Sequence, residues 1–237
     1  MADPTTASDA ASGEGPEFYS NARKYWATVP ATVDGVLGGL GYLNALDART
    51  TGAFLDRLAA AAAGAHTRGR ACDCGAGIGR VTQHVLAPRY ATVDLVESDV
   101  KFCDEARAAL SQPASGVGPD RLGDIYNVGL EGFRPPAARY DLVWCQWVLS
   151  HLSDDDLVAF LERCAAALRP GGWIGVKENT CGGDERIFDD EDSSFTRPAA
   201  LFESIFARAG LRVHATELQQ GMPPGLFKVR MWMLVPI

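Results

Sequence analysis

The stretch CDCGAGIGRVTQHV, residues 72–85, joins a short apolar run to a helical pattern through Gly75, Gly77 and Gly79. In an open parallel sheet, ligands bind where a strand passes into its helix, and glycines there let a ligand lie against bare backbone. The GxGxG spacing, followed by Arg80, differs from the GxGxxG of dinucleotide sites, and the Gly-Lys-Ser/Thr of a Walker loop does not follow. The turn predicts another type of ligand, with a plain tight turn as the alternative.

Around this turn, short apolar runs alternate with helical patterns from Arg70 onward. Such alternation is typical of βαβ units, which build a parallel sheet with helices on both faces. Ser153 and Asp156 form a capping box for a long helix from Asp154, and RPGG ends it. A helix over about 199–209 and two apolar runs, 211–218 and 227–235, joined by a short turn, predict an α/β sheet that finishes in an antiparallel hairpin.

The chain of 237 residues is long enough for one domain with a sizeable core. Residues 1–16 lack the basic start and apolar centre of a secretory signal, and we expect them to form a disordered tail. Residues 17–69 contain an aromatic helix, a glycine-rich loop from Gly35 to Gly41 and an amphipathic helix from about Thr50. We interpret them as a helical cap on an α/β core that spans residues 70–237.

The charge and the cysteines limit the possible partners. A net charge of −8 and a pI of about 5.0 disfavour nucleic-acid binding and favour a cationic substrate. No apolar run is long enough to span a bilayer, so we expect no membrane partner. The six cysteines lack the spacing of a zinc or redox centre, which predicts reduced, buried thiols and no metal: Cys72, Cys74, Cys103, Cys145, Cys164 and Cys181.

Downstream of the glycine turn, VDLVE ends in Glu97 at the tip of the second predicted strand. A carboxylate at this place can accept both hydroxyls of a ribose. The turn and Glu97 together predict a ribose-bearing ligand without a pyrophosphate. In these features the chain resembles S-adenosylmethionine-dependent methyltransferases, whose seven-stranded Rossmann-like sheet ends in an antiparallel hairpin.

More specific strings narrow the resemblance. PATVDGVLGGLG (30–41), WCQWVLSHLSD (144–154), LRPGGWIGVKEN (168–179) and FDDEDSS (188–194) are similar to those of the protein α-N-terminal methyltransferases, and the match runs from about Phe18 to the C-terminus. These enzymes use S-adenosylmethionine, release S-adenosylhomocysteine, and methylate the free α-amine of proteins that begin X-Pro-Lys or X-Pro-Arg. The resemblance implies this activity, cofactor and partner class for a protein that we expect to be a monomer in the cytoplasm, the nucleus or both.

The resemblance also implies the cofactor contacts. Arg80 pairs with the methionyl carboxylate, which suits a guanidinium because it can form two parallel hydrogen bonds. Glu97 holds the ribose, where the family has an aspartate. The other implied contacts are Gly75 and Gly77 in the turn, Ser98 and Asp99 beside the ribose, Leu130 and Glu131 around the adenine, Gln146 at the methionyl end, and Trp26 closing from the cap.

The acceptor amine needs a base, because an unperturbed α-amine has a pKa of about 7.7–8.0 and is largely protonated near neutral pH. The resemblance implies His151 for this role, with Asp192 orienting the amine and relaying its proton, and Asn179 hydrogen-bonding the amine or the first carbonyl. The remaining substrate contacts that it implies are Asp189 and Ser194 around the third-position cation, Trp147 stacked on the proline, and Tyr25, Leu37 and Gly38 in the loop that closes over the peptide.

One position departs from the family and two alternatives stay open. Phe227 stands in the last hairpin where the family has a tyrosine, so a hydroxyl contact with the substrate is missing. A methyltransferase acting on a small molecule would share the glycine turn and Glu97 but would have no use for the acidic stretch 189–194. A non-catalytic protein of this fold is expected to lack Arg80, Glu97 and the acceptor residues, all of which this chain carries.

Overall fold

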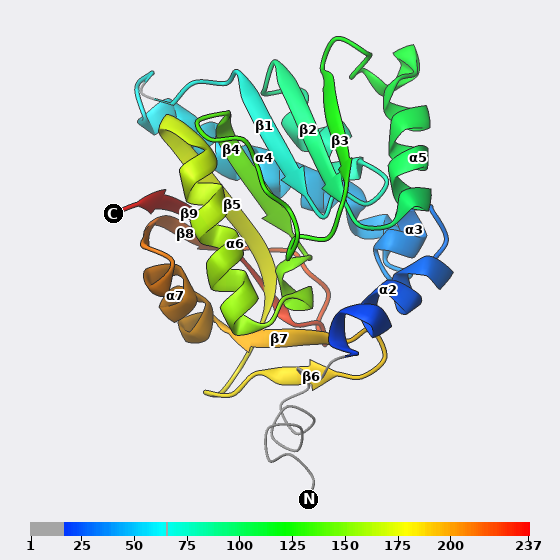
Figure 1. Ribbon diagram of the computed structural model, residues 1–237, viewed down its shortest axis with the longest axis vertical. Helices are drawn as coiled ribbons and strands as arrows, with labels where there is room; N and C mark the ends of the chain where they lie inside the picture. The colour runs from blue at the N-terminus through cyan, green and yellow to red at the C-terminus, as the bar shows by residue number, and fades with distance from the viewer. Residues whose placement is uncertain (1–16, 65) are drawn as a thin grey trace, which may run out of the picture.

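The computed structural model describes residues 17–64 and 66–237, so the tail predicted for residues 1–16 lies outside the described residues. Within these ranges nine strands form a mixed sheet flanked by helices (Figure 1). The strands are β1 (Arg70–Cys74), β2 (Thr92–Glu97), β3 (Leu122–Asn127), β4 (Tyr140–Gln146), β5 (Leu168–Cys181), β6 (Ile187–Asp189), β7 (Ser194–Pro198), β8 (Leu211–Leu218) and β9 (Lys228–Pro236). The helical segments are α2 (Phe18–Thr28), α3 (Val33–Val36), η1 (Gly41–Leu43), α4 (Asn44–Ala61), η2 (Thr82–Leu86), α5 (Val100–Leu110), η3 (Pro113–Ser115), η4 (Leu149–His151), α6 (Asp154–Ala167) and α7 (Ala199–Arg208).

The strand order places the predicted site at one edge of the sheet. Strands β3, β2, β1, β4 and β5 lie side by side and run parallel, so the carboxyl ends of β1, β2 and β4 meet at the same edge. Strand β9 pairs antiparallel with both β5 and β8, which confirms the predicted antiparallel finish. These strands make up the predicted seven-stranded sheet, and β6 and β7 extend it.

Strand β5 spans 14 residues and changes partner along its length. Its pairing with β4 is irregular near the start: Tyr140 of β4 pairs with Leu168 of β5, but Leu142 pairs with Trp173. An advance of two residues along β4 thus corresponds to an advance of five along β5. The residues 169–172 within this irregularity are the RPGG that ends helix α6, as predicted. Beyond it, β9 pairs with β5 from residue 174 to 180, and β7 pairs with its last two residues.

Alternate residues of the central strands face two separate cores. In β1, Cys72 and Cys74 belong to a core that includes α6 and α7, whereas Ala71 belongs to one that includes α4, η2 and α5. The same alternation places Val143 of β4 in the first core and Leu142 in the second. Figure 1 shows α6 and α7 in front of the sheet and α4 behind it, so helices cover both faces as predicted.

The helical cap is tied to the sheet through the end of α2. The Lys101 ammonium, at the start of α5, donates to the carbonyl oxygens of Trp26, Ala27 and Val29 at 3.2, 3.0 and 2.6 Å. The Trp26 carbonyl also accepts from the amide of Val29 at 3.1 Å, and a cation at this end complements the helix dipole. Helix α2 is thereby held over the edge where the strands end.

Helix α4 begins at Asn44, before the predicted start near Thr50. Its buried face includes Asp47 and Thr51 as well as Phe54 and Leu55. Polar residues on the buried face hide the apolar periodicity on which the prediction rested. Ser153 caps α6 as predicted, since its hydroxyl accepts from the amide of Asp156 at 3.2 Å. The reciprocal half of the predicted capping box is absent, because the Ser153 amide donates to the Tyr19 hydroxyl at 3.3 Å.

The acidic stretch 189–194 is the turn of a β-hairpin, a structure that the sequence analysis did not predict. Asp189 ends β6 opposite Ser194, the first residue of β7. The hairpin packs against the cap, because the Phe18 ring lies 5.3 Å from that of Phe195 and 6.5 Å from that of Phe188. The strands are short and carry one aromatic contact each, so their sequence gives little periodic signal.

All six cysteines are free thiols; Cys181 is half-buried and the other five are buried. Among the described residues, no helix is both long and apolar enough to cross a bilayer.

Candidate active site

Two adjoining cavities open at the carboxyl edge of the sheet. The first, here called the cofactor cavity, lies over the glycine turn and has a volume of about 1050 Å³, its open mouth included. The second, the acceptor cavity, lies between the cap, the β6–β7 hairpin and the loop before β9 and has a volume of about 1000 Å³, its mouth likewise included. Four residues line both cavities: Trp26, Val36, Trp147 and His151. A group transferred from one cavity to the other would pass these side chains.

The glycine turn is fastened to the end of β2 by Glu97. The carboxylate of Glu97 accepts from the amides of Gly77 at 2.8 Å and Asp99 at 2.9 Å. Gly75 has a φ of 69°, and a Cβ there would lie 2.4 Å from the Val148 side chain, so only glycine fits. Burial raises the pKa of Glu97, and the backbone hydrogen bonds partly offset it. The remaining lone pairs of the carboxylate face the cavity and suit ribose hydroxyls.

Nine of the ten predicted cofactor contacts line the cofactor cavity: Trp26, Gly75, Gly77, Arg80, Glu97, Ser98, Leu130, Glu131 and Gln146. Asp99 does not line it, because its side chain caps α5 by accepting from the amide of Lys101 at 2.8 Å. The cavity thus offers the Glu97 carboxylate for a ribose, the Arg80 guanidinium for the methionyl carboxylate, and an apolar wall for the adenine. This donor set fits S-adenosylmethionine.

The sequence analysis identified only one of the α2 residues in this cavity. Tyr19, Ala22 and Arg23 line it together with Trp26. Positions 19, 22, 23 and 26 lie on one face of a helix, so their spacing was an available signal. Arg23 also forms an ion pair with Glu131 across the cavity at 3.3 Å.

The acceptor cavity contains six of the nine predicted substrate contacts: Leu37, Trp147, Asn179, Asp192, Ser194 and Phe227. Tyr25, Gly38 and Asp189 do not line it. Asp189 is exposed and accepts from the amide of Glu191 at 3.0 Å. Burial raises the pKa of Tyr25, and the charges of Asp192, Glu191 and Asp189 raise it further. The approach to the cavity is therefore acidic, which suits a cationic substrate.

Asp192 presents an unsatisfied acceptor to this cavity. Its Oδ1 is buried and has no hydrogen-bond partner among the described residues. Buried polar atoms of native proteins are rarely unpaired, and an unpaired one calls for an explanation such as a ligand. An ammonium group would supply the missing donor.

Both ring nitrogens of His151 are engaged. Its Nε2 accepts from the indole Nε1 of Trp26 at 3.0 Å, and its Nδ1 lies 3.4 Å from the carbonyl oxygen of Ser193. An indole nitrogen only donates, so Nε2 is unprotonated and Nδ1 carries the proton. Burial lowers the pKa of His151, although the charge of Asp192 and the Ser193 carbonyl partly offset it. The arrangement favours a neutral imidazole.

Trp147 lies between the cavities in a left-handed backbone conformation with φ of 53°. The Arg80 Cζ lies 5.3 Å and the Lys177 Nζ 5.7 Å from the centroid of its ring. Its Nε1 is buried without a hydrogen-bond partner among the described residues. A φ in this region is uncommon for a residue with a bulky side chain, so the neighbouring turn must hold it.

Two buried charged residues, both missed by the sequence analysis, hold that turn. Glu178 accepts from the amides of Val148 and Leu149, each at 2.8 Å. Arg197 donates to the carbonyl oxygens of Leu149 at 3.1 Å and Leu152 at 2.6 Å. Burial raises the pKa of Glu178 to about 7, and hydrogen bonds from the Leu149 and Val148 amides partly oppose it. The turn that carries Trp147 and His151 is thus fixed from two strands.

Comparison with known proteins identifies the family of the chain. Residues 14–235 match the family model of AdoMet dependent proline di-methyltransferases. An alpha N-terminal protein methyltransferase 1 of Drosophila melanogaster is 45% identical over 93% of this chain and 77% of its own length. An N-terminal Xaa-Pro-Lys N-methyltransferase 1 of Danio rerio is 42% identical over 90% of this chain and 92% of its own.

Solved structures give the same result for the fold. A SAM-dependent methyltransferase of Leishmania major superposes with a TM-score of 0.83 at 37% identity, covering 93% of this chain and 83% of the other. A magnesium protoporphyrin IX methyltransferase of Synechocystis with bound SAM superposes with a TM-score of 0.61 at 17% identity, over 93% and 94% of the two chains, and shows the fold alone. With the family model matching nearly the whole chain, this protein belongs to the S-adenosylmethionine-dependent proline dimethyltransferase family.

Proposed function

We propose that this enzyme methylates the free α-amine of proteins that begin X-Pro-Lys or X-Pro-Arg. The names of the Danio rerio and Drosophila melanogaster relatives support this acceptor, since they specify protein N-termini, and the first specifies Xaa-Pro-Lys. The acidic approach to the acceptor cavity supports a substrate with a positive charge beyond its amine. The small-molecule alternative offers no reason for that acidity.

The observation that carries the proposal is the buried, unpartnered Oδ1 of Asp192 in the acceptor cavity. An α-ammonium donates three hydrogen bonds and carries the charge that a buried carboxylate needs. Asn179 lies in the same wall and can hydrogen-bond the amine or first carbonyl without adding charge. These two residues would bind and orient the amine, and Trp147 would offer its ring to the proline.

The amine must lose a proton before it can react, and His151 with Asp192 would assist that loss. When bound, S-adenosylmethionine supplies an electrophilic methyl group on a sulfonium. The carboxylate of Asp192 would receive the proton, and its charge would favour the protonated form of the nearby His151 imidazole. His151 can accept a proton at Nε2 only where Trp26 releases it, because two donors cannot share that hydrogen bond.

Mass spectrometry of a Ser-Pro-Lys-Arg peptide incubated with the protein and S-adenosylmethionine tests the proposal, with the N-acetylated peptide as control. Mass gains of one or more methyl groups on the free peptide alone are expected. Methylation of neither peptide by a protein that binds S-adenosylmethionine would contradict the proposal and favour a small-molecule acceptor.

A matched pair of variants tests the role of Asp192. Asp192→Asn is expected to reduce kcat/KM for the peptide about 100-fold, as for loss of a proton-transfer group. Asp189→Asn in the same hairpin is expected to reduce it less than about threefold, because that carboxylate is exposed and screened by solvent. Equal effects of the two substitutions would contradict the assignment of Asp192.

A further inference from the structure

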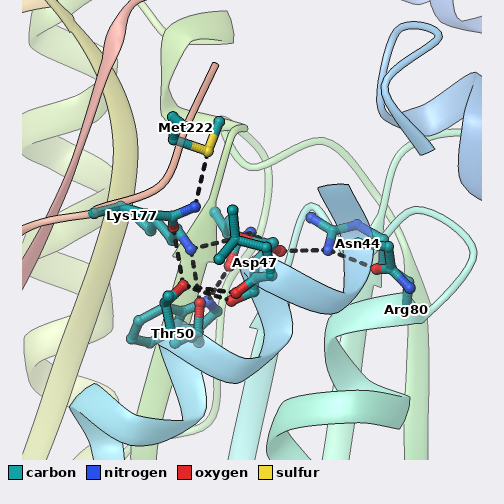
Figure 2. Close-up of polar contacts among 11 residues, drawn as sticks. Asn44, Asp47, Thr50, Arg80, Lys177 and Met222 are labelled. Carbon is teal, nitrogen blue, oxygen red and sulfur yellow. Dashed lines mark hydrogen bonds and ion pairs between the residues drawn. The ribbon is translucent and has the colours of Figure 1, made fainter. Parts of the chain in front are cut away.

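A buried carboxylate of the cap supports the methionyl end of the cofactor cavity. Asp47, in the first turn of α4, forms an ion pair with Arg80 at 2.5 Å and another with Lys177 of β5. The Nε2 of Gln146 donates to its two carboxylate oxygens at 3.0 and 2.8 Å. Figure 2 shows Asp47 at the centre of these contacts, with Arg80 on one side and Lys177 on the other.

The three charged side chains are almost completely removed from solvent. The exposed fraction is 1% for Asp47, 8% for Arg80 and 0% for Lys177. Burial alone would raise the pKa of Asp47, but the charges of Lys177 and Arg80 outweigh it and lower the pKa. Burial lowers the pKa of Lys177, and the ion pair with Asp47 opposes that shift. The charges of Asp47 and Lys177 thus support each other.

The contacts leave one carboxylate between two cations. If Lys177 were absent, Asp47 and Arg80 would form a neutral buried pair, and the guanidinium would have little attraction left for a second carboxylate. Asp73 is a further carboxylate in the cavity wall, and it interacts electrostatically with Arg80. Its carboxylate accepts a hydrogen bond from the Thr82 hydroxyl at 2.7 Å, outside the cluster.

We propose that Lys177 is a positioning residue for cofactor binding: it neutralises Asp47, so that Arg80 keeps its charge for the carboxylate of S-adenosylmethionine. Lys177 does not line either cavity, and Asp47 is the residue that joins it to Arg80. Its second contact, to the Thr51 hydroxyl at 2.8 Å, fixes the ammonium on the α4 side of β5. The inference rests on the proposed pairing of Arg80 with the cofactor carboxylate.

The test compares binding of S-adenosylmethionine with binding of its decarboxylated analogue, which lacks only the carboxylate. Calorimetry without peptide measures both dissociation constants for the wild type, Lys177→Met and the double variant Asp47→Asn/Lys177→Met. Lys177→Met is expected to weaken S-adenosylmethionine about tenfold, the effect of losing one charge-assisted hydrogen bond, and the analogue less than twofold. The double variant, in which Arg80 no longer faces a carboxylate at position 47, is expected to recover S-adenosylmethionine binding to within about threefold of wild type.

Damage to the fold would give the opposite pattern, because two core substitutions would weaken binding more than one. The proposal is overturned if Lys177→Met leaves S-adenosylmethionine affinity unchanged, weakens both ligands equally, or is not improved by the second substitution. Arg80→Met tests separately whether Arg80 pairs with the cofactor carboxylate. If this variant binds S-adenosylmethionine with unchanged affinity, that pairing is wrong. Peptide methylation is not part of these readouts, so failure of the proposed acceptor would not affect them.

Discussion

Trp26 of the cap donates its indole hydrogen to Nε2 of His151 at 3.0 Å, with the two rings inclined at 84°. The pair joins the helix that closes the cofactor cavity to the histidine that faces the acceptor. Because the bond requires an unprotonated Nε2, it stabilises the neutral imidazole. Any change in Trp26 should therefore alter the protonation of His151.

Replacing Trp26 with Phe is expected to raise the pKa of His151 by about half to one unit, the equivalent of one lost hydrogen bond. A base is active above its pKa, so the fall in kcat on the acid side should begin at a higher pH in the variant. The measurement is kcat against pH at saturating S-adenosylmethionine, which removes any effect on cofactor affinity. If kcat of the variant falls on the acid side at the same pH as in the wild type, Trp26 contributes packing alone.

Glu178 makes the stability of the fold depend on pH. Its pKa is about 7 in the folded protein, above the value near 4.3 of an unfolded chain, so the folded state binds the proton more tightly. Stability is therefore lost as the pH rises from the unfolded value through the folded one and is constant above about pH 8. Glu178→Gln keeps an oxygen for the amides of Val148 and Leu149 but does not titrate.

Relative to wild type, Glu178→Gln is expected to gain about 2.5 kcal/mol of unfolding free energy between pH 5 and pH 8. Urea denaturation at the two pH values measures this difference, in which Asp73, with its pKa of about 6, cancels because both proteins contain it. A difference independent of pH would show that Glu178 is ionised throughout.

Arg197 is expected to govern both stability and turnover. Arg197→Lys cannot reproduce the planar fork that reaches Leu149, Leu152 and Asp154, so about 2–3 kcal/mol of unfolding free energy should be lost. Because that fork holds the turn bearing His151, kcat should fall while the KM for S-adenosylmethionine stays constant. Arg208→Lys is the control, since its contact with Asp155 is exposed. Equal behaviour of the two variants would contradict the role given to Arg197.

Phe227 offers a test of acceptor affinity. Its ring lines the acceptor cavity and is 44% exposed, so a hydroxyl added to it would lie at the cavity mouth without being buried. Phe227→Tyr is expected to lower the peptide KM about threefold, as for one exposed hydrogen bond, and to leave S-adenosylmethionine binding unchanged. A higher KM would mean that the ring edge is already in contact with the substrate.

The sequence predicted those features that have a local signature. Strand β8 has the predicted bounds of residues 211–218, and β9 begins at Lys228, one residue after its predicted start. Both strands contain apolar runs bounded by turns. Glu97 and the glycine turn were paired correctly since both follow parallel strands, whose carboxyl ends meet.

The supporting charges could not be found in this way. Asp47, Lys177, Glu178 and Arg197 are not distinguished by any local pattern, and each is separated in sequence from its partners by tens of residues. A buried charge is tolerated only with a partner, and one sequence does not show which partner the fold provides. The contact between Asp47 and Lys177 spans 130 residues of chain.

The irregular pairing at the start of β5 determines where the strand can tolerate insertions and deletions. Successive residues of a strand face opposite sides, so Lys177 reaches α4, while Glu178 reaches the turn at Val148. One residue inserted or deleted between 173 and 176 would exchange these two side chains and destroy both supports. The segment 169–172 is already out of register with β4, so length changes there should leave the downstream register intact. Natural insertions and deletions in this strand are therefore expected to cluster at RPGG and to be absent between it and the site.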